Sequence, residues 1–282
     1  MIKQNLLDLC RWAREQRTHF YWCLGLGALA ALTLGQYLTD SGTMLSREGT
    51  DTFSQLVYTY ALGFDELLRG HLVKWNPYVY GGQPFLGQFQ TGLLYPGNWL
   101  FMGLPIALAL NWIIFAHAWL MGAGVYGWAV WRGTRSLSAF LAGAAVMLGG
   151  PFFLHIYSGH IPHLECMALA PFVLWGVDGW LRRRHAGWIM LSASAAALQI
   201  YAGHPQYFYY TAIVSGLFAL VFLADAQRKK SAVIGLLAIY PLALVLSARN
   251  CCRGWRRPAS RCDQAALIMS LPRCSRCRGR IF

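Results

Sequence analysis

The sequence predicts an all-α, polytopic membrane protein, and three observations lead to this fold class. Hydrophobic residues make up 56% of the 282 residues and charged residues only 12%, about half the charged share of an average soluble domain. The apolar residues gather in runs of about 20, the length that an α-helix needs to cross a bilayer. Basic residues cluster beside alternate ends of these runs. Such clusters usually mark the cytoplasmic side of a membrane protein.

Seven apolar runs are predicted to be membrane spans. In chain order they are His19–Leu38, Pro105–Trp131, Ser136–Tyr157, Leu164–Leu181, Ala186–Ala202, Tyr207–Ala224 and Ala232–Ser247. Lys3 and three arginines precede the first span, so the positive-inside rule places residues 1–18 in the cytoplasm as an N-terminal segment. With this orientation, every Lys and Arg cluster up to Lys230 lies on the cytoplasmic side. We therefore predict a transmembrane domain over residues 19–248, whose first span is an uncleaved anchor.

The same topology places residues 39–104 outside as one long loop, and loops of this length usually carry a function or a structure of their own. Within the loop, Asp51–Leu68 is predicted to be an amphipathic helix at the membrane interface, with Thr50 or Asp51 as its N-cap. Its apolar residues recur three and four positions apart: Phe53, Leu56, Val57, Tyr60, Ala61 and Phe64. The segment Trp75–Gly97 follows. Its many Gly, Pro, Trp and Tyr residues favour an ordered, turn-rich loop with an aromatic lining.

The net charge of +13 does not indicate a nucleic-acid partner. Nine arginines and one aspartate lie in Arg249–Phe282, so this segment alone carries +8, and the other 248 residues carry +5. Most of that remainder lies in short clusters beside the apolar runs, where it sets topology rather than forming a phosphate-binding face. The partner that the composition predicts is therefore membrane lipid, with no nucleic acid.

Arg249–Phe282 departs from the rest of the chain in cysteine content as well as in charge, with five of the eight cysteines. Its Cys274-x-x-Cys277 pair raises the question of zinc, but the spacing matches no common zinc cluster and the segment has no histidine. Read one nucleotide out of phase, codons for "RNCCRGW" can spell Gln-Leu-Leu-Pro-Gly-Val, an ordinary membrane-protein sequence. We therefore expect a frameshift near Ala248 that truncated a longer protein, and a disordered tail without function.

Polar motifs recur beside the outer ends of the predicted spans. They are Asp51-x-x-x-Gln55, Trp75-Asn76-Pro77, Gly81-Gly82-x-Pro84, Tyr95-Pro96-x-Asn98, Gly159-His160 and Gly203-His204-Pro205-Gln206. In this order, the motifs resemble the N-terminal half of the bacterial YfhO-type membrane proteins. The resemblance covers about Leu34 to Ser247.

The resemblance implies a GT-C-like architecture, in which many helical spans carry a large first outer loop. It also implies transfer of a sugar from a polyprenyl-phosphate donor to a cell-envelope acceptor, on the outer face of the bacterial inner (plasma) membrane. In such enzymes an acidic residue at the start of the first outer loop is typically essential, and Asp51 matches that position. The chain departs from the family by stopping after seven spans, which puts its own activity in doubt.

Asp51 is the predicted catalytic residue on chemical grounds too. Transfer of a sugar to a hydroxyl needs a base that takes the acceptor proton, and a carboxylate can be that base. It can instead hold a divalent cation against the donor phosphate, and that cation is the one cofactor to consider. A plain helix cap is the alternative role. The expected substrate-binding residues are Gln55, Trp75, Asn76, His160, His204 and Gln206.

Three histidines, His160, His163 and His204, lie at the outer ends of predicted spans, where they can share a pocket. Three histidines can bind zinc, but interfacial histidines more often contact backbone carbonyls or lipid phosphate, so we predict no metal site. Asp178 lies inside the fourth span near its cytoplasmic end and is expected either to snorkel to the interface or to pair with Arg182 one helical turn on.

Two other function classes remain open. A transporter or flippase for a lipid-linked or small substrate would place ionisable groups or broken helices near mid-membrane. In this sequence the polar motifs lie at the outer ends of spans, with Gly149-Gly150-Pro151 as the main exception. The second alternative is a non-catalytic membrane protein, which no motif favours directly.

Overall fold

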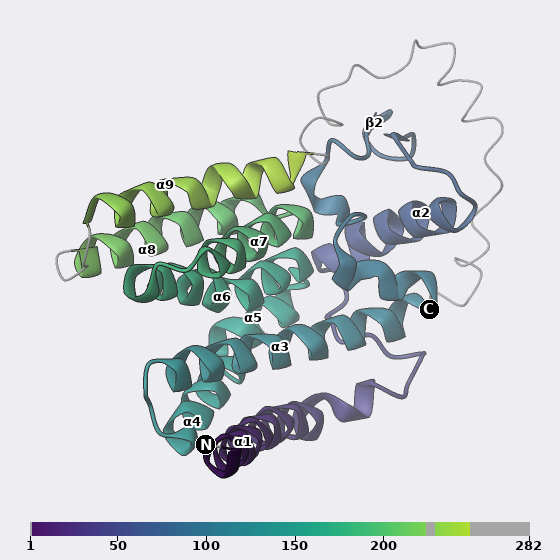
Figure 1. Cartoon of the computed structure of the whole chain (residues 1–282). Coiled ribbons are helices and arrows are strands. Elements are labelled where there is room, and N and C mark those ends of the chain that lie inside the picture. Colours follow the sequence, from purple (N-terminus) through teal and green to yellow (C-terminus); the bar gives the residue numbers. More distant parts are fainter. Residues whose placement is uncertain (1, 224–228, 249–282) are drawn as a thin grey trace.

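A computed structural model of the chain describes residues 2–223 and 229–248. Within them the chain is a bundle of helices with a single two-stranded sheet, which confirms the all-α prediction (Figure 1). The helices are α1 (Ile2–Leu34), α2 (Val57–Leu68), α3 (Ile106–Trp131), α4 (Ser136–Met147), α5 (Gly150–Ser158), α6 (Ile161–Arg183), α7 (Ala186–Ala202), α8 (Pro205–Leu223) and α9 (Lys229–Leu246). The predicted basic tail, residues 249–282, lies outside the described residues.

Six helical segments in the described part are long and apolar enough to cross a membrane, so the chain is a multi-pass membrane protein. They coincide with all the predicted spans except Ala186–Ala202, which forms α7. This apolar helix has 17 residues, about 26 Å of helix against a hydrocarbon core of about 30 Å. It still runs the length of the bundle, because Trp188 packs on Gly179 near one end and His204 meets His163 at the other. A count of seven spans stays a prediction.

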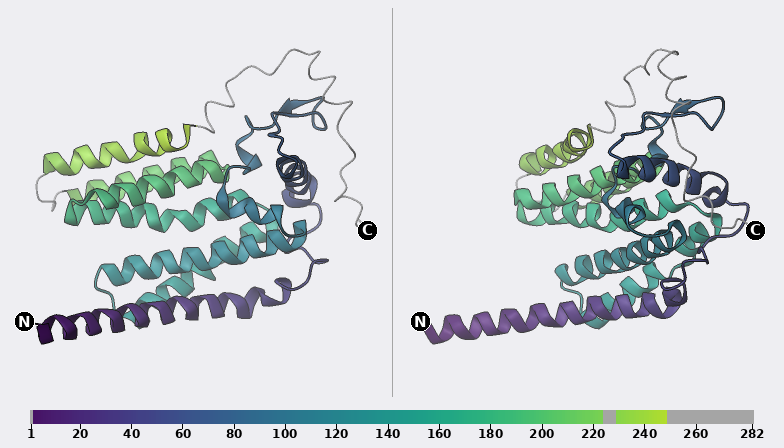
Figure 2. Two further views of the ribbon diagram at one scale, coloured as in Figure 1. Left: turned by 45° about the vertical axis from the view of Figure 1, so that its right-hand side comes forward. Right: turned by 90° about the vertical axis from the view of Figure 1, so that its right-hand side faces the viewer.

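Two of the predicted spans differ in form from the expectation. The first is part of a continuous helix, α1, that extends beyond the other helices (Figure 2), so the predicted N-terminal segment is helical from Ile2 and continuous with the span. The third is broken into α4 and α5. Pro151 lacks the N–H that a continuous helix requires, and Gly149 takes an extended conformation with ψ 145°. The chain therefore starts a new helix at Gly150.

The loop of residues 39–104 covers one end of the bundle, which we call the loop end. It contains a π-helical turn (Thr52–Leu56), α2, the antiparallel hairpin β1 (Trp75–Asn76) and β2 (Gln83–Pro84), and the 3-10 helices η3 (Phe89–Thr91) and η4 (Pro96–Met102). Asn111 of α3 fixes the start of this loop. Its side-chain oxygen accepts from Leu45 N at 2.8 Å, and its amide donates to Tyr37 O and Thr43 O at 2.9 and 2.8 Å.

The predicted amphipathic helix forms, but its apolar face does not lie on lipid as expected. Leu56, Tyr60 and Phe64 are buried in the main hydrophobic core. The rings of Tyr60 and Phe64 stack on Phe101 of η4, with centroids 4.7 and 5.4 Å apart. The aromatic residues that follow α2 in the loop fold back over it, and this burial holds the loop on the bundle.

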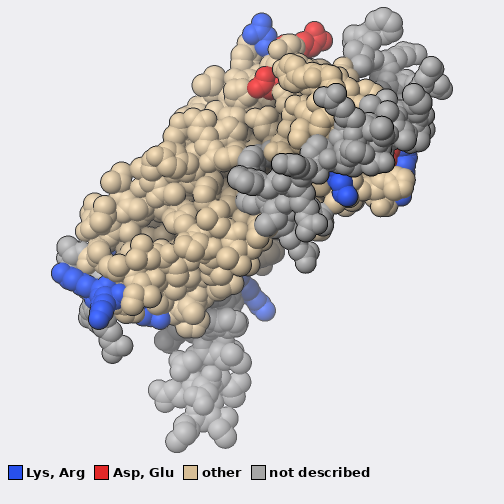
Figure 3. Space-filling view, turned by 90° about the horizontal axis from the view of Figure 1, so that it is seen from above, with Lys and Arg blue, Asp and Glu red and all other residues tan. Residues whose placement is uncertain are grey.

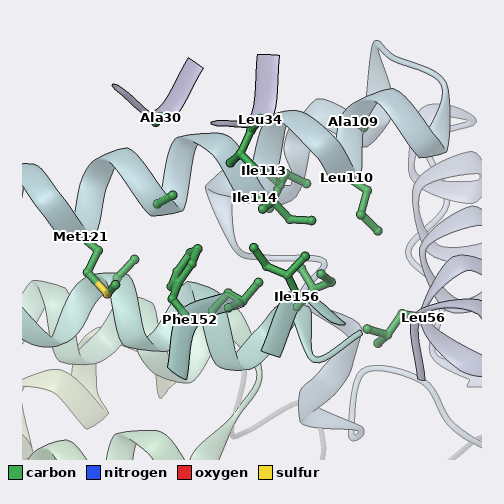
Figure 4. Packing of buried hydrophobic residues seen from close by; sticks show 14 of the residues in the cluster. Ala30, Leu34, Leu56, Ala109, Leu110, Ile113, Ile114, Met121, Phe152 and Ile156 are labelled. Atoms are coloured by element: carbon green, nitrogen blue, oxygen red, sulfur yellow. The ribbon is translucent and has the colours of Figure 1, made fainter. Parts of the chain in front are cut away.

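The main core joins α1, α3 and α5 (Figure 4). Ile113 and Ile114 of α3 lie between Leu34 of α1 and Ile156 of α5, and each is at most 5% exposed. On the face drawn in Figure 3, the visible Asp and Glu side chains lie at one end of the molecule, and Lys and Arg side chains lie at both ends. We call the end opposite the loop end, where α6 finishes at Arg182 and Arg183, the basic end. Asp178 lies near it and pairs with Arg182 at 2.9 Å, which confirms the prediction for this residue.

Close approach of α3 and α4 depends on Gly143. A Cβ at this position would lie 2.6 Å from the backbone oxygen of Gly122, whereas a Cβ at Gly216 in α8 would meet no atom within 4 Å. We expect Gly143→Ala to destabilise the protein by about 1–3 kcal/mol. Gly216→Ala, the matched control, should stabilise it by about 0.5–1 kcal/mol, because alanine favours helix. Thermal unfolding of both variants in one detergent checks this, and equal stabilities would contradict the packing described.

Candidate functional site

A buried hydrogen bond brings two distant segments together at the loop end. Thr52 Oγ1 donates to Gly159 O at 2.8 Å. Gly159 ends α5 in the left-handed conformation, with φ 75°, which favours glycine. A Cβ there would also lie 2.7 Å from Thr50 Oγ1 and 2.8 Å from Thr52 Oγ1. Glycine is therefore required at this position for two independent reasons. The bond places Asp51 beside His160.

Asp51 contacts a histidine and does not cap its helix. Its Oδ2 lies 3.3 Å from His160 Nε2, and its side chain is 67% exposed. No hydrogen bond runs from this side chain to the first turn, so the cap that was the alternative role is not formed. An exposed carboxylate beside an imidazole can accept a proton or orient the ring, and both roles suit acid–base chemistry.

Four of the eight histidines form a cluster behind Asp51, with His163 at its centre. The centroid of the His163 ring lies 3.6 Å from that of His204, 4.7 Å from that of His160 and 5.1 Å from that of His155. His155 Nδ1 lies 3.3 Å from His160 Nδ1, and His155 Nε2 bonds Tyr207 OH at 2.8 Å. These rings come from α5, α6 and the turn before α8, so the cluster ties three elements together.

The cluster disfavours positive charge on His204. Burial, and then the charges that His160 and His155 carry when protonated, lower the pKa of His204 below its ordinary value of 6.5. Its Nδ1 accepts from Tyr207 N at 3.4 Å, which also requires an unprotonated nitrogen. His204 is therefore a neutral ring at pH 7 that caps α8. A neutral imidazole can donate to a phosphate or hydroxyl through its other nitrogen.

A small cavity opens beside Asp51 and has a volume of about 10 Å³, room for about one water molecule. Its lining consists of Asp51, Gln55, Leu56, Gln90, Gly159, His160, Pro162 and His163. Gln55 Nε2 donates to Gln90 Oε1 at 3.4 Å, so the two amides meet across the lining. The structure thus brings Asp51, Gln55 and His160 together, with His204 behind them through His163.

The other expected substrate-binding residues lie apart from this cavity. Asn76 is buried in β1, where its Oδ1 accepts from Tyr78 N at 3.0 Å in a local turn. Trp75 packs against Gly82 in the hairpin. Gln206 is exposed and donates to Tyr210 OH on its own helix. Trp75 and Asn76 therefore shape the hairpin, and none of the three contacts Asp51 in the described part of the chain.

Sequence reasoning missed His155, Tyr207 and Gln90. His155 lies five residues before His160 at the end of the same broken span, so a count of histidines near span ends could have found it. Tyr207 follows the Gly-His-Pro-Gln motif by one residue and faces the cluster because α8 begins there. Nothing in the local sequence marks Gln90, whose position depends on how η3 folds back over α2.

The remaining described surface offers no comparable set of groups. A larger cavity of about 510 Å³ lies at the basic end between α6, α7 and α9, and its lining is apolar except for Ser231 and Lys230. Among the described residues, no group of three or more His, Cys, Asp or Glu side chains has a geometry that could hold a metal ion.

The chain was compared with models of protein families, with curated proteins and with solved structures, and none of the three comparisons gave a match. The function is therefore argued from the chemistry of the site.

We expect acid to destabilise the loop end through His204. A histidine whose pKa is lower in the folded chain than in the unfolded chain stabilises the fold above the unfolded value, near 6.5, and this contribution is lost as pH falls through the folded value. His204→Asn keeps an N-cap but removes the titration. Its melting temperature should therefore fall less between pH 7 and pH 5 than that of the unsubstituted protein.

His185→Asn is the matched control for this variant. His185 also caps a helix, accepting from Gly187 N at the start of α7, but lies outside the cluster. This variant also replaces a capping histidine by asparagine, and it should change the pH dependence less than His204→Asn does, because it leaves the cluster intact. Equal pH dependence in His204→Asn and the unsubstituted protein would contradict the assignment.

Proposed function

We propose that this chain is a membrane glycosyltransferase of GT-C-like architecture. It transfers a sugar from a polyprenyl-phosphate donor to a cell-envelope acceptor on the outer face of the bacterial inner membrane. The observation that carries the proposal is the Asp51 carboxylate, exposed at the loop end and 3.3 Å from His160 rather than used as a helix cap. The motifs that resemble the YfhO-type proteins supply the reaction class.

In the proposed step, the acceptor hydroxyl oxygen attacks the anomeric carbon of the donor sugar. The bond from that carbon to the phosphate oxygen breaks, and polyprenyl phosphate leaves with the bonding electron pair. Asp51 takes the hydroxyl proton as the new glycosidic bond forms. His160 orients the carboxylate through its contact at 3.3 Å.

The residues beside Asp51 suit the polar parts of such substrates. Gln55 and Gln90 present amide groups that can bond sugar hydroxyls, and the histidine cluster can contact phosphate. The volume of about 10 Å³ does not hold a sugar ring, so a substrate must part Gln55 from Gln90 or bind above them. Movement of the η3 segment, which carries Gln90, is the smallest change that opens the cavity.

One observation favours the second candidate, a transporter of a lipid-linked or small substrate. The carboxyl of Glu165 is fully buried inside the α6 span, and ionisable groups within spans often mark ion or substrate pathways. In the described residues, however, the cavities lie at the two ends of the bundle. The transferase reading therefore uses more of the observed site, and no observation favours a purely non-catalytic protein.

Asp51→Asn separates chemistry from folding, because the change keeps the size of the side chain. We expect sugar transfer to fall by on the order of 10²–10⁴-fold, the usual contribution of a general base, with unchanged membrane insertion. The assay measures transfer from polyprenyl-phosphate sugars in proteoliposomes, for this chain and for the longer reframed chain. Asp40→Asn is the matched control, since Asp40 is an exposed loop acid bonded to Gly42 N. Full activity in Asp51→Asn would refute the catalytic role.

The proposed orientation places the loop end outside the cell. A cysteine at Ser41, which is exposed in the loop, should react with a membrane-impermeant thiol reagent in intact cells. A cysteine at His185, exposed near the basic end, should react only after the cells are opened. The chain without added cysteines gives the background. The reverse pattern would invert the topology and remove the proposed site from the outer face.

A further inference from the structure

Glu165 stands apart from the other buried carboxylates of the described chain. Its side chain is 0% exposed, and neither carboxyl oxygen has a hydrogen-bond partner. Glu66 and Asp178 are also buried, but each is ion-paired, Glu66 with Arg69 at 2.6 Å and Asp178 with Arg182 at 2.9 Å. None of the ion pairs among the described residues includes Glu165. An isolated buried carboxylate is costly, and such groups usually become neutral instead.

The titratable groups that face Glu165 are all acids, and none supplies a positive charge. They are Tyr60 from α2, Tyr95 from the segment before η4, and Cys166 from α6. Burial raises the pKa of Tyr60 and of Tyr95 well above 10. Both phenols therefore stay protonated and neutral at any physiological pH.

Two of these neighbours, Tyr95 and Cys166, already donate their protons to other groups. His117 Nδ1 lies 2.7 Å from Ile113 O, which accepts only, so Nδ1 is the protonated nitrogen. Its Nε2 must then accept from Tyr95 OH, at 2.7 Å. Cys166 Sγ donates to Gln199 O at 3.3 Å. The Tyr95 hydroxyl and the Cys166 thiol therefore cannot donate to Glu165.

Two polar groups beside the carboxyl remain without partners. Tyr60 OH and the side-chain oxygen of Asn98 are buried and make no hydrogen bond, while the Asn98 amide donates to Gly92 O at 3.2 Å and also interacts with the Glu165 carboxyl. An ionised Glu165 only accepts, so it cannot satisfy the Asn98 oxygen. A protonated carboxyl has one O–H to donate and keeps oxygens that accept. The neutral acid is the form whose donors and acceptors match its surroundings.

We propose that Glu165 is a proton-binding site, and that its neutral carboxyl is the buried polar group at which the loop meets the bundle. The segments that meet at Glu165 lie next to those that line the small cavity. Tyr60 belongs to α2, which follows the π-helical turn after Asp51. Asn98 of η4 bonds the backbone two residues after Gln90, and Glu165 follows His163 in α6. Release of the proton would leave a bare negative charge between these segments and loosen the loop above it. The proton site does not depend on the sugar-transfer reaction.

Infrared spectroscopy of the whole chain in lipid nanodiscs tests this directly, because a protonated carboxyl has a C=O stretching band that a carboxylate lacks. At pH 7 we expect one such band in the unsubstituted protein and its loss in Glu165→Gln. Glu66→Gln, the matched control, should keep the band because Glu66 is ion-paired. Identical spectra of the unsubstituted protein and Glu165→Gln in this region would overturn the proposal.

Two further measurements keep the test decisive. If Glu165→Gln does not fold, Tyr60→Phe removes only a hydroxyl, and it should shift the band without abolishing it. An unshifted band would refute an interaction between the Tyr60 hydroxyl and the Glu165 carboxyl. The spectra are also recorded in sodium and in choline buffers. A band that appears only without sodium would mean that the site binds a metal cation, which would contradict a proton site.

Discussion

The hydrogen bond from Thr52 to Gly159 is the contact on which the site geometry depends. Its partners are 107 residues apart, and each is the immediate neighbour of a residue of the site. Gly159 can make this bond because it has a positive φ and no Cβ. The candidate site therefore lies at the contact between the loop and the helix bundle. The positions of its residues depend on backbone conformation as much as on side chains.

Polar groups lie in two layers at this contact, and the two layers differ in their exposure to water. Asp51 lies at the surface, where its side chain is 67% exposed to water. Glu165, in the layer below, is enclosed by phenols, a thiol and an amide that cannot compensate a charge. In the proposed roles, the same functional group is a reactive carboxylate in one place and a structural acid in the other. Water, rather than residue type, determines which role is possible.

The sequence predicted the helices well because membrane spans depend on length and hydrophobicity, which are local properties. The bounds of α3 and α7 agree with the predicted spans to within a residue. The loop was harder, since α2 has the same apolar periodicity whether it covers lipid or protein. Asp51 and His160 could be selected from their positions at span ends, but Gln90 could not, because its place depends on long-range folding. Glu165 could have been selected as an ionisable residue within a predicted span, but its burial without a charged partner is a tertiary property.

The break at Gly149 has a consequence for how the chain tolerates change. In a continuous helix, adding or removing one residue rotates every later side chain by about 100° around the axis. Here the helical register restarts at Gly150, so the directions of His155 and Gly159 are set by the nine residues of α5 alone. An insertion or deletion in α4 can be absorbed at the break without turning the histidines away from Asp51. The geometry of the site is thus independent of changes in the length of α4.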